Sequence, residues 1–285
     1  MIDLHTHAIS RDTHAYPLEP LGGERSAWSH ERPVSAEELL RHMDEAGVKR
    51  AALVQASTAY GFDNRYVADV LEAHADRFVG VASVDFFAPD AVDRITYWIR
   101  DRGLGGVRIR AAHGSTRVPT PGTGLDDPAM NPVWEHLERA GVPVCVQMHA
   151  HQTRSLAAVL RRFPRLIVAL DHGARPPLDG GPPYDAAAEL FPLAAFERVY
   201  LKLTSVTFLR AAGEPGGDPR ALVRKLVDGF GADRVCWGSN FPASKGSLRA
   251  LRDLAQDAFG ALTEEERRKV CDETAKTIYP ALAGA

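Results

Sequence analysis

Short runs of β-branched and apolar residues alternate along this chain with longer segments of helical periodicity. Parallel strands need a crossover helix between them, so this alternation favours βα units over hairpins. Eight units in 285 residues predict closure into a (β/α)8 TIM barrel, and no GxGxxG follows the first strand to suggest a dinucleotide fold. The predicted strands are 2–5, 51–55, 78–84, 106–110, 142–148, 166–171, 199–203 and 234–238.

Helix start signals frame several of the intervening segments. Ser35 followed by Glu38 has the pattern of a capping box, and Thr263 with Glu266 repeats it beyond the eighth strand. The second pair predicts a C-terminal helix after the last strand. No repeat, low-complexity segment or shift in composition divides the chain. We therefore expect one barrel domain over residues 1–285.

Three connections are unusually long and rich in proline or glycine, at 8–34, 111–127 and 173–184. Each follows a predicted strand, so in a barrel all three lie at the C-terminal face, where active sites are built. The loop 8–34 after the first strand is rich in aromatic and histidine side chains, which is unusual for a flexible tether. We interpret that loop as a lid over the site.

The composition excludes several classes of function. A net charge of −3 gives no basis for binding nucleic acid or an anionic membrane. No apolar run reaches the roughly 20 residues of a membrane span, and the opening MIDLHTHA has no secretory pattern. Cys145, Cys236 and Cys271 lack CxxC spacing, which is typical of reduced thiols. These features predict a cytoplasmic protein whose partner is a small molecule.

The first strand ends in His5-Thr6-His7. Residues two apart on a strand point the same way, so both imidazoles can face one metal ion. Three later strands end in compatible groups at the same barrel mouth: Gln147-Met148-His149, Asp171-His172 and Ser239-Asn240. A single strand-end histidine can also be satisfied by a neighbour without any chemical role. The convergence of four strand ends favours a site.

Arg108 and Arg110 share one face of the fourth strand. Their guanidinium groups can hold a carboxylate or a lactone oxygen with two hydrogen bonds. Both are therefore candidate substrate-binding residues. For Arg110, a salt bridge at the strand end is the alternative.

The motifs HTH, LDHGARP, LKL and WGSNFP together resemble those of the amidohydrolase superfamily. The segment LVQASTAYGFDNRYVADVL (53–71) is similar to the subgroup of 2-pyrone-4,6-dicarboxylate hydrolases and sugar or muconolactone lactonases. GVRIR and VPVCVQMH fit the same pattern, so the resemblance covers essentially the whole chain. It implies a barrel that hydrolyses a small lactone or a related carbonyl compound.

Carried over position by position, the resemblance implies a ligand set of His5, His7 and His149 and a water- or substrate-binding role for His172. A divalent ion, Zn²⁺ first and Mn²⁺ second, would polarise the carbonyl and lower the pKa of bound water. The subgroup also contains members without metal. In metal-free operation the same histidines would act as hydrogen-bond donors to the carbonyl.

The VQxS pattern of the second strand implies substrate contacts for Gln55 and Ser57. Lys202 stands in the LKL motif of the seventh strand. The resemblance leaves two roles open for that lysine, a contact to substrate or a structural pair with a buried carboxylate.

Asn240 departs from the family pattern, which usually has an aspartate there as the general base. An amide accepts no proton near pH 7. Either His172 or His149 is the base, or a metal-bound hydroxide attacks without one, or hydrolysis is lost. Plain turn chemistry before Phe241-Pro242 is a further explanation of the amide.

Two arginines of the pyrone hydrolase have no counterpart at matching spacing, because Arg117 and Arg210 are offset from them. A substrate with one carboxylate or none is therefore expected. A non-oxidative decarboxylase and a ligand-binding barrel without catalysis remain as alternatives. By analogy with barrels of this kind we expect a homodimer.

Overall fold

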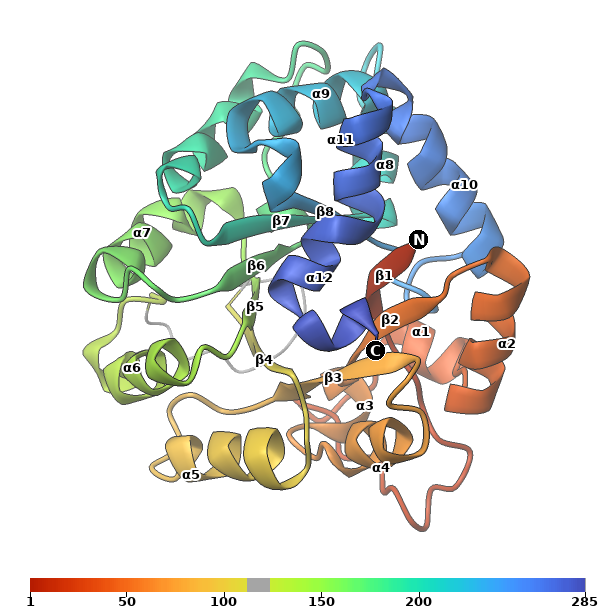
Figure 1. Ribbon diagram of the computed structural model, residues 1–285, viewed down its shortest axis with the longest axis vertical. Helices are drawn as coiled ribbons and strands as arrows, with labels where there is room; N and C mark the ends of the chain where they lie inside the picture. The colour runs from red at the N-terminus through yellow and green to blue at the C-terminus, as the bar shows by residue number, and fades with distance from the viewer. Residues whose placement is uncertain (112–123, 285) are drawn as a thin grey trace.

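The computed structural model describes residues 1–111 and 124–284. Its eight parallel strands pair in sequence order, each with the next, and confirm the predicted (β/α)8 barrel (Figure 1). The strands are β1 (Ile2–Thr6), β2 (Arg50–Val54), β3 (Phe78–Ser83), β4 (Gly106–Arg110), β5 (Val144–Gln147), β6 (Val168–Asp171), β7 (Val199–Thr204) and β8 (Val235–Gly238).

Helices surround the barrel as an outer layer (Figure 1). They are α1 (Ala27–Glu31), α2 (Ala36–Ala46), α3 (Ser57–Tyr60), α4 (Arg65–Ala73), α5 (Ala91–Thr96), α6 (Asn131–Ala140), α7 (Thr153–Arg162), α8 (Ser205–Ala212), α9 (Pro219–Phe230), α10 (Leu248–Ala258), α11 (Glu264–Arg268) and α12 (Thr274–Ile278). A 3-10 segment, Asp185–Ala195, takes the place of a helix between β6 and β7. Both predicted capping boxes form, at Ser35 before α2 and at Thr263 before α11.

The barrel interior changes from apolar to charged along its axis. Near the strand starts it is filled by apolar and cysteine side chains, including Leu4, Val81 and Cys145. The chain end that follows α12 closes this side, where the hydroxyl of the buried Tyr279 lies 3.3 Å from Cys145 Sγ. Figure 1 shows α12 lying across this end of the barrel. The predicted C-terminal helix thus acts as a plug, which leaves the opposite end for the site.

The seam between β8 and β1 is closed by side-chain and loop contacts instead of an extended ladder. Asp3 Oδ1 accepts hydrogen bonds from the backbone N–H groups of His5 (3.0 Å) and Ser239 (2.8 Å). Asn240 N–H donates to the carbonyl oxygen of His5 at 2.8 Å. Gly238 permits this approach, because a Cβ there would lie 2.7 Å from His5 Cβ. The seam therefore joins the two strands whose ends carry His7 and Asn240.

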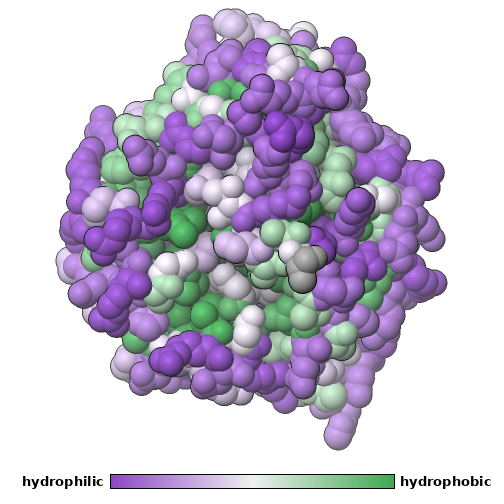
Figure 2. All heavy atoms as spheres, viewed as in Figure 1, coloured by the Kyte–Doolittle hydropathy of each residue, from purple (hydrophilic) through white to green (hydrophobic). Residues whose placement is uncertain are grey.

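The face of the molecule on which α12 lies is mostly hydrophilic at its surface. Hydrophobic residues are visible there mainly in the hollows between elements (Figure 2). Among the described residues, no helix has the length and apolarity needed to cross a bilayer. The three cysteines form no disulfide. Of the predicted loop 111–127, the segment 112–123 with Arg117 lies outside the described residues.

Candidate active site

A cavity of about 280 Å³ opens at the C-terminal ends of the strands. That volume suits a small molecule. The side chains around it come from the ends of β1, β2, β4, β5, β6 and β8 and from the loop after β1. They are His7, Ser26, Trp28, Ala56, Ser57, Thr58, Arg108, Arg110, Gln147, His172, Arg175, Asn240 and Ala243. The cavity lies at the C-terminal face of the barrel, where the sequence predicts the site.

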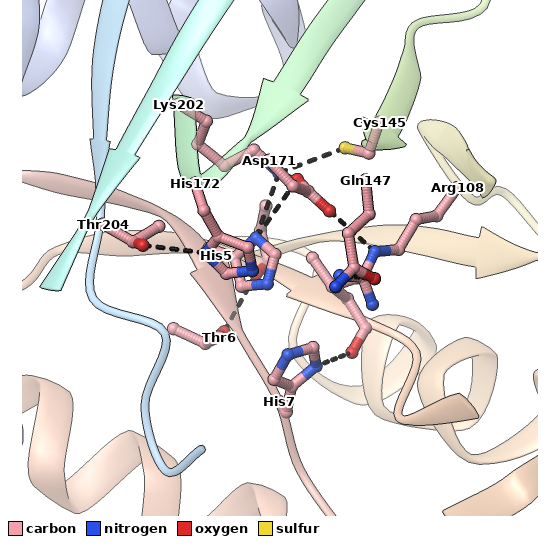
Figure 3. Close-up of polar contacts among 12 residues, drawn as sticks. His5, Thr6, His7, Arg108, Cys145, Gln147, Asp171, His172, Lys202 and Thr204 are labelled. Carbon is pink, nitrogen blue, oxygen red and sulfur yellow. Dashed lines mark hydrogen bonds and ion pairs between the residues drawn. The ribbon is translucent and has the colours of Figure 1, made fainter. Parts of the chain in front are cut away.

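A buried ion network lies behind this pocket (Figure 3). The carboxylate of Asp171 is fully buried, with Lys202 Nζ 2.8 Å from Oδ1 and Arg108 Nε donating to Oδ2 at 2.7 Å. Burial alone would raise the pKa of Asp171, but attraction to Lys202 and Arg108 outweighs it and holds that pKa well below its usual value. Lys202 is itself fully buried and does not line the pocket. Its environment is the one expected for the structural pair.

His7 has a defined tautomer. Its Nδ1 lies 2.7 Å from the carbonyl oxygen of Val54, which can only accept, so Nδ1 carries the proton and Nε2 holds a lone pair. Burial, reinforced by the charge of Arg108, lowers the pKa of His7 to about 3. The ring also stacks on Trp28 with 5.3 Å between centroids. A neutral His7 in this tautomer presents an acceptor at Nε2, which differs from the donor role expected for it in metal-free operation.

His172 is the second neutral imidazole of the pocket. Its Nδ1 lies 2.8 Å from Thr204 Oγ1, and its ring centroid lies 5.0 Å from that of His5. Burial lowers the pKa of His172 well below 6.5, against the opposing charge of Asp171. The threonine hydroxyl can accept from Nδ1 or donate to it, and in the tautomer in which Nδ1 donates, Nε2 is the proton acceptor. This is the property that a general base needs near neutral pH.

His172 begins a left-handed turn that has no equivalent elsewhere among the described residues. Residues 172–175 all have positive φ, with values of 56, 60, 57 and 45°. Each of the three non-glycine residues in such a conformation costs about 1–2 kcal/mol. The hydroxyl of Thr207 helps to hold the turn by donating to the carbonyl of His172 at 3.1 Å. The turn places His172 and Arg175 on the same pocket, and such stored strain is typical of functional sites.

Asn240 also lines the pocket and has positive φ, at 60°. Its Nδ2 donates to Ser244 Oγ at 2.9 Å, which leaves Oδ1 to accept a further hydrogen bond. The amide can therefore hold a water molecule but cannot take its proton.

The predicted substrate-binding residues divide into two groups. Arg108, Arg110 and Ser57 line the pocket, and Arg110 Nη1 donates to Ser57 Oγ at 2.8 Å. Arg108 also reaches Gln147 Oε1 at 3.3 Å. Gln55, in contrast, is fully buried and uses its Nε2 on two backbone carbonyls of the following loop. Its contacts are those of a residue that holds α3 in place.

His149 is half-buried and is not among the residues that line the pocket. Its ring stacks on that of His151, with 5.5 Å between centroids. Within residues 1–111 and 124–284, no group of three or more His, Cys, Asp or Glu side chains is placed to hold a metal ion. The structure therefore does not bring the predicted set of His5, His7 and His149 together.

The other donors point in different directions. His5 Nε2 is buried and has no hydrogen-bond partner among the described residues, which would suit a metal-ligating nitrogen, and the ring centroids of His5 and His7 lie 5.0 Å apart. Against a metal stand the arginines that line the pocket and the carboxylate of Asp171, which is already engaged by Lys202 and Arg108. Histidines alone can bind zinc, but the positive charge of the pocket disfavours a divalent cation.

Sequence reasoning missed Arg175 and Trp28 as parts of the pocket wall. It placed Gln147 at the barrel mouth by strand alternation but gave it no role. Trp28 stood in the loop predicted to be a lid, and its stacking on His7 brings that loop to the pocket. Arg175 had no signal, because side-chain alternation does not extend into a left-handed turn.

Comparison with known proteins gives a consistent picture. A family model described as amidohydrolase matches residues 2–281. An L-fucono-1,5-lactonase from Burkholderia ambifaria is 29% identical over 252 residues, which cover 86% of this chain and 81% of the lactonase.

Three solved structures share the barrel over 98% of this chain. One from Pseudomonas putida, assigned as a 2-pyrone-4,6-dicarboxylic acid hydrolase, has a TM-score of 0.78 at 21% identity and is covered over 97% of its length. An amidohydrolase from Burkholderia multivorans with bound zinc has a TM-score of 0.76 at 22% identity, with 98% covered. A 2,6-dihydroxybenzoate decarboxylase from Rhizobium has a TM-score of 0.72 at 16% identity, with 98% covered.

Proposed function

This chain belongs to the amidohydrolase family that matches it over residues 2–281, and from that premise we propose that it hydrolyses a small lactone. One observation carries the proposal. The neutral imidazole of His172 and the amide of Asn240 share a cavity of about 280 Å³ with the cationic side chains of Arg108 and Arg110. A proton acceptor and oxyanion-stabilising cations on one small pocket are the requirements for attack of water on an ester carbonyl.

In this proposal the guanidinium groups of Arg108 and Arg110 hold the carbonyl oxygen of the lactone. Negative charge develops on that oxygen as water attacks, and fixed cations in a site shielded from solvent stabilise it. Arg108 is anchored to Asp171 and Arg110 to Ser57, so neither needs to reorient during the reaction. The arginines thus polarise the carbonyl without a role for the histidines as donors.

The attacking water is held by Asn240 Oδ1, and its proton passes to Nε2 of His172. His172 is held at Nδ1 by Thr204. The tetrahedral intermediate then expels the ring oxygen, which takes the proton back from His172. The balance is one lactone and one water giving one hydroxy acid, which releases its proton to solvent. The missing aspartate is thus replaced by two groups, one that orients the water and one that accepts its proton.

The test is hydrolysis of a panel of five- and six-membered lactones, followed by acid release. We expect turnover of at least one lactone by the natural protein and a loss of about 10²- to 10⁴-fold in kcat for His172→Asn. His136→Asn, a substitution on the outer helix α6, is the matched control and should keep full activity. Equal rates for His172→Asn and the natural protein would contradict the assignment of the base.

The decarboxylase alternative is examined on the same samples by release of CO₂ from hydroxybenzoates. CO₂ release without hydrolysis of any lactone would replace the proposed reaction by decarboxylation.

A further inference from the structure

The pocket has an excess of positive charge. Arg108, Arg110 and Arg175 line it, and Lys202 lies behind it. The residues described as lining it include no aspartate or glutamate, and the buried carboxylate of Asp171 is already shared by two of the four cations. The histidines add no charge, since burial keeps them neutral. A cavity of this kind favours an anion.

Arg175 lines the pocket without a side-chain hydrogen bond to any described residue. Its Nε is buried and has no hydrogen-bond partner among the described residues. Burial and the charges of Arg210 and Arg108 lower the pKa of Arg175, so its surroundings within the protein disfavour its charge. Arg210 is itself tied to the carbonyl oxygen of Pro176 at 2.9 Å and remains a repulsive neighbour. An anion placed against Arg175 would accept a hydrogen bond from its Nε and would offset the burial and repulsion that disfavour its charge.

The left-handed turn fixes the position of Arg175 relative to His172. His172 and Arg175 are its first and last residues, and both face the cavity. Whatever Arg175 binds is therefore held at a fixed separation from the proton-accepting imidazole. Arg108 is committed to Asp171 and Gln147, which leaves it little freedom to bind a second anionic group.

We propose that the lactone carries a single carboxylate, separate from its reacting carbonyl, and that Arg175 binds this carboxylate in the pocket. The inference deepens the proposed function and rests on it for the identity of the reaction. The binding of the anion itself does not depend on hydrolysis, so the two can be tested separately.

The binding test uses benzoate and benzamide, which have nearly the same shape and differ in charge. We expect calorimetry to show benzoate binding the natural protein about 10- to 100-fold more tightly than benzamide, the range of a charge-assisted hydrogen bond. Arg175→Gln should bring that ratio close to one. Arg198→Gln, which removes a cation from the exposed surface, should leave the ratio unchanged.

The kinetic test compares one lactone that carries a carboxylate with its neutral amide analogue. Arg175→Gln should reduce the preference for the acid, measured as the ratio of kcat/KM values, by about 10- to 100-fold. Arg175→Lys keeps the charge but loses the planar fork, so an intermediate ratio is expected. Arg175→Lys also keeps the inference testable if Arg175→Gln does not fold.

The outcomes separate the two proposals. Loss of benzoate selectivity in Arg175→Gln without hydrolysis of any lactone would overturn the proposed reaction and leave the anion site standing. Equal affinity of the natural protein for benzoate and benzamide, or an unchanged acid preference in both Arg175 variants, would overturn the inference while hydrolysis stands.

Discussion

The imidazole of His172 is uncharged near neutral pH, and this state sets the pH dependence of the proposed reaction. Burial holds its pKa below 6.5, and only the neutral ring can take a proton from water. We therefore expect kcat/KM for a neutral lactone to stay level from pH 8 down to 6.5 and to fall only at more acidic pH. A pH–rate profile with a falling limb at or above 6.5 would contradict this role.

Lys202 supports the site through Asp171. Removing one partner of a buried ion pair leaves an uncompensated charge, which typically costs about 3–5 kcal/mol. We expect that loss in the free energy of unfolding of Lys202→Met, measured by urea denaturation. Arg108 still contacts the carboxylate, which places the effect at the lower end of the range.

A double variant checks the cause. Lys202→Met combined with Asp171→Asn removes this pair but also takes the carboxylate from Arg108, so its loss of stability should be smaller than the sum of the two single losses. If the two losses simply add, the pair is not what makes the lysine important.

For single residues, the sequence predicted much of the pocket lining, because strand alternation tells which side chains share a face. His7, His172, Asn240, Arg108, Arg110 and Ser57 all line the cavity as predicted from strand ends. Alternation says nothing about depth along the barrel axis, so it could not show that Lys202 and Gln55 are fully buried away from the cavity. The tautomer of His7 depends on a carbonyl 47 residues away.

Among the elements, the seam between β1 and β8 depends on Asp3. Burial, only partly opposed by its hydrogen bonds, raises the pKa of Asp3 from 3.8 to about 6. Between pH 4 and 6 the folded chain thus keeps a proton that the unfolded chain releases. The contribution of Asp3 to stability is therefore greatest below pH 4 and declines, by about 3 kcal/mol, as pH rises through 6.

Asp3→Asn should abolish that decline while keeping an oxygen that accepts from the seam N–H groups. Urea denaturation at pH 4, 5, 6 and 7 should show the stability of the variant rising relative to the natural protein by up to about 3 kcal/mol across the series. A constant difference between the two proteins would contradict the raised pKa.

His149 shows the limit of predicting strand ends from the sequence. The strand was predicted over 142–148, and parity placed His149 on the same face as Gln147. In the structure β5 ends at Gln147, and a 3-10 turn, Ala150–Gln152, follows. The backbone of His149 is still extended, but beyond the last paired residue of β5 its side chain no longer lines the cavity. Strand ends are fixed by tertiary contacts that the local pattern does not contain.

On the scale of the whole molecule, the arrangement of donors and charges predicts independence from metal. We expect lactone hydrolysis to survive dialysis against EDTA with at least half of its rate, with no gain on adding Zn²⁺ or Mn²⁺. The measurement pairs the rate with the metal content of the protein before and after chelation.

His5→Ala provides the contrasting outcome. Near-stoichiometric zinc in the natural protein, lost together with activity in His5→Ala, would establish a metal centre and overturn the arginine-based polarisation. Retention of activity by the EDTA-treated protein would support polarisation of the carbonyl by the arginines.

The barrel as a whole was predictable, because eight alternating units leave few ways to bury both faces of a parallel sheet. The individual contacts that close it were not. The contact of Gly238 with β1 and the bridge from Asp3 to Ser239 join residues more than 230 positions apart. No periodicity within a window of the sequence encodes such a pairing.

Because β1 and β8 meet at the pocket, ligand affinity and barrel closure are thermodynamically linked. The amides of His7 and Asn240 donate across this junction, to the carbonyls of Phe241 and His5. Local opening of the barrel there would expose both amides to solvent deuterium and would also disassemble the pocket wall. A ligand that binds only the closed barrel stabilises it against local opening. Hydrogen exchange at these two amides should therefore slow by the same factor by which the ligand lowers the population of the open form. Exchange at the ladder between β2 and β3, whose paired residues do not line the pocket, provides the internal reference.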